Sequence, residues 1–141
     1  ERAGSTKVLH LHGEATKVRP EDGEYDRSYS EKEVVDIGYD EVHLGDKAPN
    51  GSQLRPHIVF FGEAVPNIEK AIDIVSAADI MLIVGTSLNV YPAAGLYRYA
   101  PNGIPIYLID PEDVAIADPR ITQIRQVATK GMETFRRMLG Q

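Results

Sequence analysis

The feature that most constrains the fold of this chain is a run of five consecutive apolar residues at positions 80–84, which stops at Gly85-Thr86-Ser87. A strand in which every residue is apolar is usually covered on both faces, as the strands of parallel sheets are. Covering both faces of a sheet requires helices on each side of it. The run therefore predicts an α/β fold, in which the flanking residues supply the helices and the neighbouring strands.

Strand-like and helix-like patterns alternate around this run. Pro66 suits the first turn of a helix, and the apolar residues after it recur at the spacing of one helical face. The expected order is a strand at 57–61, a helix with the apolar stripe Ile68, Ala71, Ile72 and Val75, the strand at 79–85, a short helix at 91–100, a strand at 104–110, a short strand near 121–129, and a closing helix at 130–139 with Met132, Phe135 and Leu139 facing inward. This alternation is typical of right-handed βαβ units, so we expect a Rossmann-like, doubly wound parallel sheet.

Composition excludes several classes of protein. The chain of 141 residues is about the length of one domain and contains no cysteine, so neither a disulfide framework nor a thiolate metal site can form. Four scattered histidines are a poor basis for a structural metal site, and a formal charge of −6 argues against a general nucleic-acid binder. Since no apolar run approaches the roughly 20 residues of a membrane span and the first residues lack the layout of a signal peptide, we expect a cytoplasmic protein.

Residues 15–52 differ from the rest of the chain. They contain ten acidic and five basic residues and show no sustained period. We interpret them as a small, irregular inserted module with a helical turn near 30–35 and a short strand near 41–44. A solvated surface excursion and a docking module for a partner would both have this composition. The predicted division places residues 1–14 and 53–141 in one Rossmann-like portion and residues 15–52 in the module.

The corner after the apolar run has the chemistry of a ligand site. In an open parallel sheet, ligands bind in the crevice beyond the carboxyl ends of the strands, and Gly85 stands at such an end. Glycine permits a sharp turn and a close approach, while the amides and hydroxyls of Thr86 and Ser87 can donate to phosphate or ribose oxygens. Asp110, at the end of the next strand, stands where a ribose hydroxyl could be bound. A simple turn followed by a helix cap would use the same residues, and without a full G-x-G-x-x-G the pattern names no nucleotide.

Four blocks of the sequence, in order, resemble the C-terminal half of the sirtuins, the NAD-dependent protein-lysine deacylases. "ERAGSTKVLHLHG" is similar to the segment that follows the catalytic histidine, "LRPHIVFFGEAVP" to the acyl-lysine-binding strand, "GTSLNVYPAAG" to the NAD-ribose loop, and "IYLIDPE" to the next nucleotide-contacting strand end. The resemblance covers nearly the whole chain. It implies a parent protein that is an NAD-dependent protein deacylase, with NAD as cofactor and an acyl-lysine peptide or protein as substrate.

The resemblance also implies roles for individual residues. Gly85, Thr86 and Ser87 would hold the adenosine ribose and the phosphates, Asp110 and Glu112 the ribose edge, and Ala128 would lie near the adenine. The substrate cleft would be lined by Val59, Phe61, Gly62 and Glu63 together with Asn89, Val90 and Tyr91, with an extended peptide added as a strand between the two backbone segments. Val59 and Phe61 suit an apolar tunnel for an acyl-lysine stem, but they equally suit the core of a strand. Asp110 stands where the family more often has asparagine, and its carboxylate would repel nearby phosphate.

The histidines do not supply the general base that the family uses. In sirtuins that histidine lies immediately before the residues that match the start of this chain, and His10, His12, His43 and His57 all lie elsewhere. We therefore expect no catalytic residue in this chain, the N-terminal half of the fold as a partner, and no deacylase activity from the chain alone. The alternative function is a non-catalytic module that binds a nucleotide or an acyl-lysine peptide without turnover.

The absence of zinc-binding cysteines is a further departure from the common pattern of the family. Many sirtuins carry four cysteines in the small module, and their absence makes this chain similar to a zinc-less bacterial branch. We therefore expect no zinc, and side-chain packing would hold the module together. The candidates for that packing are Tyr25, Tyr29, Val34, Val35, Ile37 and Tyr39.

Overall fold

The structure, a computed structural model, describes residues 1–21 and 31–140. The chain forms two compact units, Glu1–Asn67 and Ile68–Gln141, and each contains its own three-stranded sheet. Among the described residues, no helix has both the length and the apolar character needed to cross a membrane. The predicted division into residues 1–14 with 53–141 and an inserted module at 15–52 remains a prediction.

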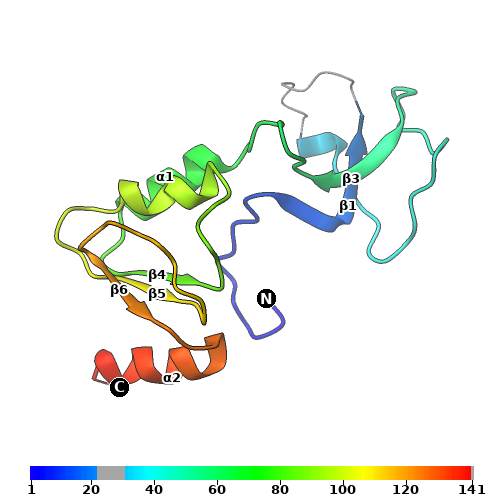
Figure 1. Cartoon of the computed structure of the whole chain (residues 1–141). Coiled ribbons are helices and arrows are strands. Elements are labelled where there is room, and N and C mark those ends of the chain that lie inside the picture. The colour runs from blue at the N-terminus through cyan, green and yellow to red at the C-terminus, as the bar shows by residue number, and fades with distance from the viewer. Residues whose placement is uncertain (22–30, 141) are drawn as a thin grey trace. The chain divides into compact units, whose positions relative to one another are not determined.

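The first unit is built on an antiparallel sheet. Its strands are β1 (Gly13–Pro20), β2 (Val35–Asp36) and β3 (Leu54–Ile58), arranged in the order β2-β1-β3. Figure 1 shows β1 and β3 side by side. The 3-10 turn η1 (Glu31–Glu33) precedes β2 and agrees with the helical turn predicted near 30–35. Arg19 of β1 lies opposite Arg55 of β3 in the strand register, and both side chains are buried.

Two strand predictions for this unit are wrong. The strand expected at 57–61 runs instead from Leu54 to Ile58 and pairs antiparallel with β1, so it does not join the parallel sheet. The sequence pattern did not indicate β1, because a bulge between Glu14 and Val18 interrupts the alternation of apolar and polar residues. The strand expected near 41–44 is absent: residues 41–43 are irregular and a turn begins at Leu44, where the amide of His43 donates to the carboxylate of Asp46.

The predicted packing of the acidic module is partly wrong. Val34 and Ile37 are half-buried, as expected, whereas Val35 and Tyr39 are exposed. β2 is only two residues long, so it covers little of the side chains beside it. The other two candidates, Tyr25 and Tyr29, lie outside the described residues.

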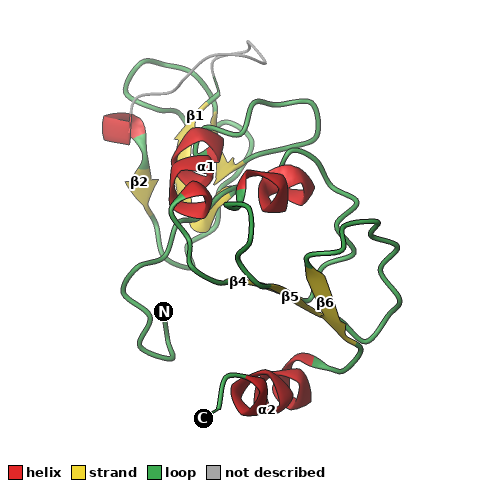
Figure 2. Cartoon of the chain, turned by 90° about the vertical axis from the view of Figure 1, so that its left-hand side faces the viewer, coloured by secondary structure: helices red, strands yellow, loops and turns green. Residues whose placement is uncertain are grey.

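The second unit contains the expected parallel sheet. Its elements are α1 (Ile68–Ser76), β4 (Met81–Val84), the 3-10 helix η2 (Ala93–Tyr99), β5 (Ile106–Ile109), β6 (Ile121–Ile124) and α2 (Ala128–Met138). The strands are parallel in the order β4-β5-β6, and α1 and α2 lie on opposite sides of the sheet in both views (Figures 1 and 2). The fold class predicted from the apolar run is therefore confirmed.

Alternate residues of the strands fill two separate cores. Ile83, Ile106 and Leu108 form a cluster against which Val75 of α1 packs. On the other face, Ile109 and Ile124 pack against Phe135 of α2, together with the half-buried Leu82 and Tyr107. Both faces of β5 are thus covered, which explains why its sequence shows no alternation of polar and apolar residues.

The closing helix packs differently from the prediction. Phe135 is buried, and its ring meets that of Tyr107 edge-on with the centroids 5.0 Å apart. Met132 and Leu139, which were expected to face inward, are exposed, whereas Gly131 is buried. A methyl group added at Gly131 would collide with the side chain of Ile109, so the glycine allows α2 to approach β5 closely.

Candidate functional site

The carboxyl ends of the parallel strands meet at one edge of the sheet. Val84, Ile109 and Ile124 lie level with one another in the strand register and are the last residues of β4, β5 and β6. The residues that follow them therefore emerge at the same edge, as the sequence predicts for Gly85 and Asp110. This is the edge at which open α/β sheets bind ligands.

The corner at Gly85 is open. Gly85 has a φ of +65°, and a Cβ atom placed there would meet nothing within 4 Å. Its amide donates to the carbonyl of Ile109 at 2.9 Å, so the sheet ladder ends at this residue before the chain turns away. This backbone conformation favours glycine, and the space beside it admits a bound group.

The two hydroxyl residues differ in their surroundings. The Thr86 hydroxyl accepts a hydrogen bond from the amide of Leu88 at 3.1 Å, and it can still donate its own proton. Leu88 packs against the core cluster around Ile83, which fixes the end of the turn. Ser87 is exposed.

A cavity of about 900 Å³ lies beside this corner within the second unit. One part of its wall comes from the loop after β4, including Ser87, Asn89 and Tyr91. Another part comes from the loop after β5, which contributes Glu112 and the residues that follow it as far as Arg120. Two residues of η2, Tyr97 and Arg98, complete it. The crevice that the sequence predicts beyond the strand ends is thus present at β4 and β5.

The carboxylate of Asp110 forms a hydrogen bond within the chain at this edge. It is 9% exposed, and its Oδ1 atom accepts a hydrogen bond from the amide of Glu112 at 2.9 Å. This bond turns the chain sharply after β5 and leaves the Glu112 side chain exposed in the cavity wall. Ala128 is exposed at the first position of α2, which follows β6 after the linking segment 125–127.

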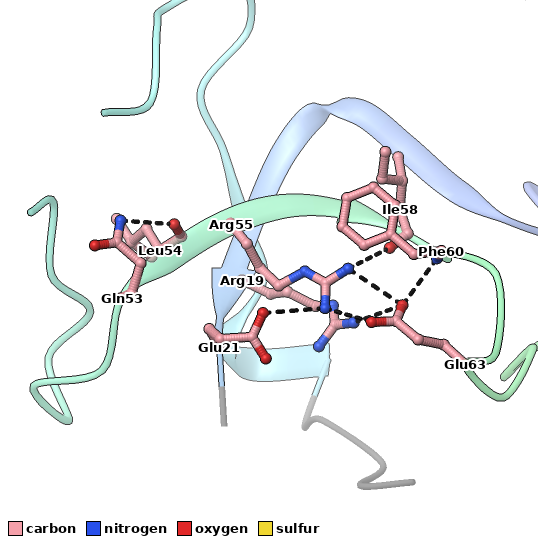
Figure 3. A network of polar contacts seen from close by, with 8 residues as sticks. All are labelled: Arg19, Glu21, Gln53, Leu54, Arg55, Ile58, Phe60 and Glu63. Carbon is pink, nitrogen blue, oxygen red and sulfur yellow. Dashed lines mark hydrogen bonds and ion pairs between the residues drawn. The ribbon is translucent and has the colours of Figure 1, made fainter. Parts of the chain in front are cut away.

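The segment predicted to bind substrate in the first unit follows β3. The amide of Val59 donates to the carbonyl of His12 at 2.9 Å and so continues the pairing with the chain before β1. Phe61 is 91% exposed and Gly62 is exposed, so Phe61 is not a core residue of this unit. Unlike the exposed Phe61, Glu63 has a side chain that belongs to a polar network (Figure 3).

The polar network joins Glu63 to two buried arginines (Figure 3). Nη1 and Nη2 of Arg55 lie 2.5 and 3.2 Å from the two carboxylate oxygens of Glu63, and Arg19 Nη2 lies 3.7 Å away. Glu21 adds a second carboxylate, 3.1 Å from Arg55 Nη1. Burial alone would raise the pKa of Glu63, but the hydrogen bonds from Arg55 and Phe60 and the positive charges of Arg55 and Arg19 outweigh it and hold that pKa below its ordinary value.

Sequence reasoning assigned no role to Arg19 and Arg55. Their exposed fractions are 7% and 8%, and buried arginines need acidic partners. The signal available in the sequence was Arg55 eight residues before Glu63, but only the chain reversal after β3 brings the two side chains together. The position of Arg19 depends on β1, which the pattern did not reveal.

The segment predicted to bind substrate in the second unit is exposed. Asn89, Val90 and Tyr91 all expose their side chains, and Asn89 and Tyr91 also line the cavity. Arg98 Nη2 lies 3.5 Å from the hydroxyl of Tyr91. This loop therefore presents both backbone and polar side chains to a ligand.

The four histidines all belong to the first unit. His10 Nε2 lies 3.1 Å from Glu1 and 3.2 Å from Glu14, and these three are the described residues whose ligand atoms are grouped closely enough for a metal ion. Burial, followed by the positive charge of Arg19, lowers the pKa of His57. The sheet edge that carries Gly85 therefore has no histidine within its own unit.

Comparisons with known proteins agree with this geometry. A model of the Sir2 family matches residues 1–92. An NAD-dependent protein deacylase from Bacteroides thetaiotaomicron is 52% identical over 140 residues, which are 99% of this chain and 59% of that protein. This chain thus spans about three-fifths of the length of that curated relative.

Solved structures give the same result. The ADP-ribose complex of a mutant Sir2 homologue matches with a TM-score of 0.76 and 29% identity, over 99% of this chain and 56% of that one. Sir2Tm bound to a propionylated peptide matches with a TM-score of 0.71 and 28% identity, over 97% and 58% of the two chains. The Rossmann-like fold inferred from the sequence is therefore confirmed.

Proposed function

The chain belongs to the Sir2 family, and from that premise we propose that it forms the adenosine-binding and peptide-binding part of an NAD-dependent protein deacylase. The observation that carries the proposal is the corner at the exposed Gly85, the half-buried Thr86 and the exposed Ser87, which lies at the carboxyl edge of a parallel sheet beside a cavity of about 900 Å³. Doubly wound sheets bind nucleotides at such an edge. The activity named for the Bacteroides relative and the ADP-ribose bound to the Sir2 homologue support the same assignment.

The residues at the sheet edge suit the adenosine half of NAD. The backbone at Gly85 would lie against the ribose and phosphates, and the hydroxyls of Thr86 and Ser87 would donate to their oxygens. Oδ2 of Asp110 and the exposed carboxylate of Glu112 would accept hydrogen bonds from ribose hydroxyls. Ala128 would leave room for the adenine. When bound, NAD supplies the ribose that receives the acyl group.

The residues proposed to bind substrate lie in both units. In the first unit, the chain at the half-buried Val59 and the exposed Phe61 and Gly62 would pair with an extended acyl-lysine peptide, and Glu63 would belong to the same surface. In the second unit, Asn89, Val90 and Tyr91 would bind the same class of substrate. The propionylated peptide bound to Sir2Tm supports a peptide as the ligand.

Three further expectations belong to this proposal. The 141-residue chain would have no deacylase activity by itself, since none of its four histidines stands at the position of the family's general base. The protein would act in the cytoplasm. It would need no zinc, because the chain has no cysteine with which to hold the metal.

A deacylation assay tests the proposed function. An acetyl-lysine peptide and NAD are incubated with the product of the complete encoding gene and, separately, with the 141-residue chain, and nicotinamide release is followed by chromatography. We expect the complete gene product to release nicotinamide and the chain alone to release none. A complete gene product that binds ADP-ribose but leaves the peptide acylated would contradict the proposal and favour the non-catalytic binding module.

A further inference from the structure

The exposed segment after β3 is shaped by a tight turn. The amide of Glu63 donates to the carbonyl of Phe60 at 3.1 Å, and the amide of Phe60 donates to Oε2 of Glu63 at 2.9 Å. Glu63 thus closes the turn at both ends, once through its backbone and once through its side chain. Phe61 and Gly62, between these bonds, are exposed.

Arg55 holds the same turn from inside the unit (Figure 3). Its guanidinium donates hydrogen bonds to both carboxylate oxygens of Glu63, at 2.5 and 3.2 Å, and to the carbonyl of Ile58, at 3.4 Å. The guanidinium carbon also lies 4.3 Å from the centre of the Phe60 ring. A single planar group therefore contacts the end of β3, the start of the turn and the carboxylate that closes it.

A gain in folding stability is a weak explanation for the largely buried Arg55–Glu63 ion pair. Burying charged groups is costly, and a buried ion pair often contributes no more stability than well-packed apolar residues of similar volume. Such a pair does restrict geometry, because two parallel hydrogen bonds hold the planar guanidinium and the carboxylate in a defined relative orientation. The contacts of this pair lie at both ends of the turn that carries the exposed Phe61 and Gly62.

We propose that Arg55 is a positioning residue, which acts through Glu63 to hold the backbone of residues 60–62 in the conformation that receives an acyl-lysine peptide. This inference rests on the proposed function. It also changes the part played by Glu63: its carboxylate faces Arg55 and the Phe60 amide, so it shapes the substrate surface from within and does not contact the acyl-lysine.

The test uses steady-state deacylation of an acetyl-lysine peptide at saturating NAD by the complete gene product. Arg55→Met removes the charge, Arg55→Lys keeps the charge without the planar fork, and Glu63→Gln removes the carboxylate. Lys17→Met is the matched control, because Lys17 pairs with Glu14 within β1 and lies opposite Asp36 of β2. The Kd for ADP-ribose and the unfolding midpoint are measured on every variant.

We expect Arg55→Met and Glu63→Gln to raise the peptide KM at least about tenfold, with kcat changed less than about threefold and the Kd for ADP-ribose unchanged. Arg55→Lys should recover part of the loss, and Lys17→Met should resemble the wild type. Should Arg55→Met fail to fold, Arg55→Lys and Glu63→Gln carry the test.

Two results would overturn the inference. One is a peptide KM within about twofold of the wild type in folded Arg55→Lys and Glu63→Gln. The other is a parallel loss of kcat, peptide binding and ADP-ribose binding that follows the unfolding midpoint, because a merely structural role would have that effect. A wild-type protein without deacylation would instead refute the proposed function, so the two failures are distinguishable.

Discussion

At the residue scale, the carboxyl of Glu63 links the stability of the first unit to pH. Burial would raise its pKa, but hydrogen bonds from Arg55 and the Phe60 amide and two nearby positive charges hold the pKa below its ordinary value of 4.5. Ionised Glu63 therefore contributes stability that is fully present above pH 4.5 and is lost as the pH falls through the lower folded pKa.

We predict that the free energy of unfolding of the wild type falls more steeply than that of Glu63→Gln between about pH 5 and about pH 3. The glutamine variant cannot ionise, so it lacks this source of pH dependence. Urea unfolding followed by circular dichroism at a series of pH values measures the difference. Parallel curves for the two proteins would show that Glu63 is not held in its charged form.

Gly85 carries the second prediction at this scale. Its φ of +65° strains any other residue, and the position beside it is open. Gly103, with a φ of +90° and open space beside it, precedes β5 and so lies near the amino ends of the strands. Substitutions at the two glycines should cost similar backbone strain. A comparison of the two variants therefore separates that strain from an effect on ligand binding.

Gly85→Ala and Gly103→Ala should each lower the free energy of unfolding by about 1–2 kcal/mol, the cost of a left-handed conformation. Only Gly85→Ala should weaken ADP-ribose binding, by at least about tenfold, which corresponds to roughly 1.4 kcal/mol. Chemical denaturation and calorimetry measure the two quantities. Equal effects of both variants on ADP-ribose binding would argue against a nucleotide at the corner.

Single residues also show what the sequence could indicate. The sharp turn at Gly85 and the place of Asp110 at a strand end followed from residue type and from position after an apolar strand. The inward orientation of Glu63 did not, because it depends on Arg55, and a buried arginine looks in sequence like an exposed one. The roles of these residues toward NAD and substrate remain proposals.

At the scale of elements, the contact between α2 and β5 depends on Gly131. A methyl group there would collide with the side chain of Ile109, so Gly131→Ala should lower the free energy of unfolding by about 1–3 kcal/mol through overpacking. Alanine's better helix propensity offsets at most about 1 kcal/mol of this. Thr129→Ala, at an exposed position of the same helix, should stay within about 0.5 kcal/mol of the wild type.

Denaturant unfolding of the two variants measures this difference. A Gly131→Ala protein as stable as the wild type would show that α2 can shift away from β5 without loss of packing.

The elements were predicted well where one local pattern determines them. The parallel strands β4 and β5 are short and apolar, and the alternation with helices predicted the parallel sheet to which they belong. β1 was not predicted, and β3 was predicted at other residues and in the parallel sheet. Both errors arise because these strands pair with each other over a long sequence separation, in an antiparallel ladder with a bulge. Helix α2 and the burial of Phe135 were predicted correctly. The burial of Gly131 was not, because a glycine adds no apolar side chain to the sequence pattern.

At the scale of the whole molecule, the chain consists of two compact units with different sheets. Family membership extends over this architecture, because the structural matches cover up to 99% of the chain. Since the chain spans 59% of the Bacteroides relative, the catalytic cycle is a property to be tested on the complete gene product.

Nuclear magnetic resonance of the isotopically labelled 141-residue chain during titration with ADP-ribose tests the central claim most directly. The amides of Gly85, Thr86 and Ser87 should shift together with those of Asp110 and Glu112, while the amides of Gly103 and of β3 stay unchanged. Binding at this edge should be seen even if its affinity is low. Unchanged signals at residues 85–87 in millimolar ADP-ribose, or shifts confined to other parts of the chain, would contradict the account.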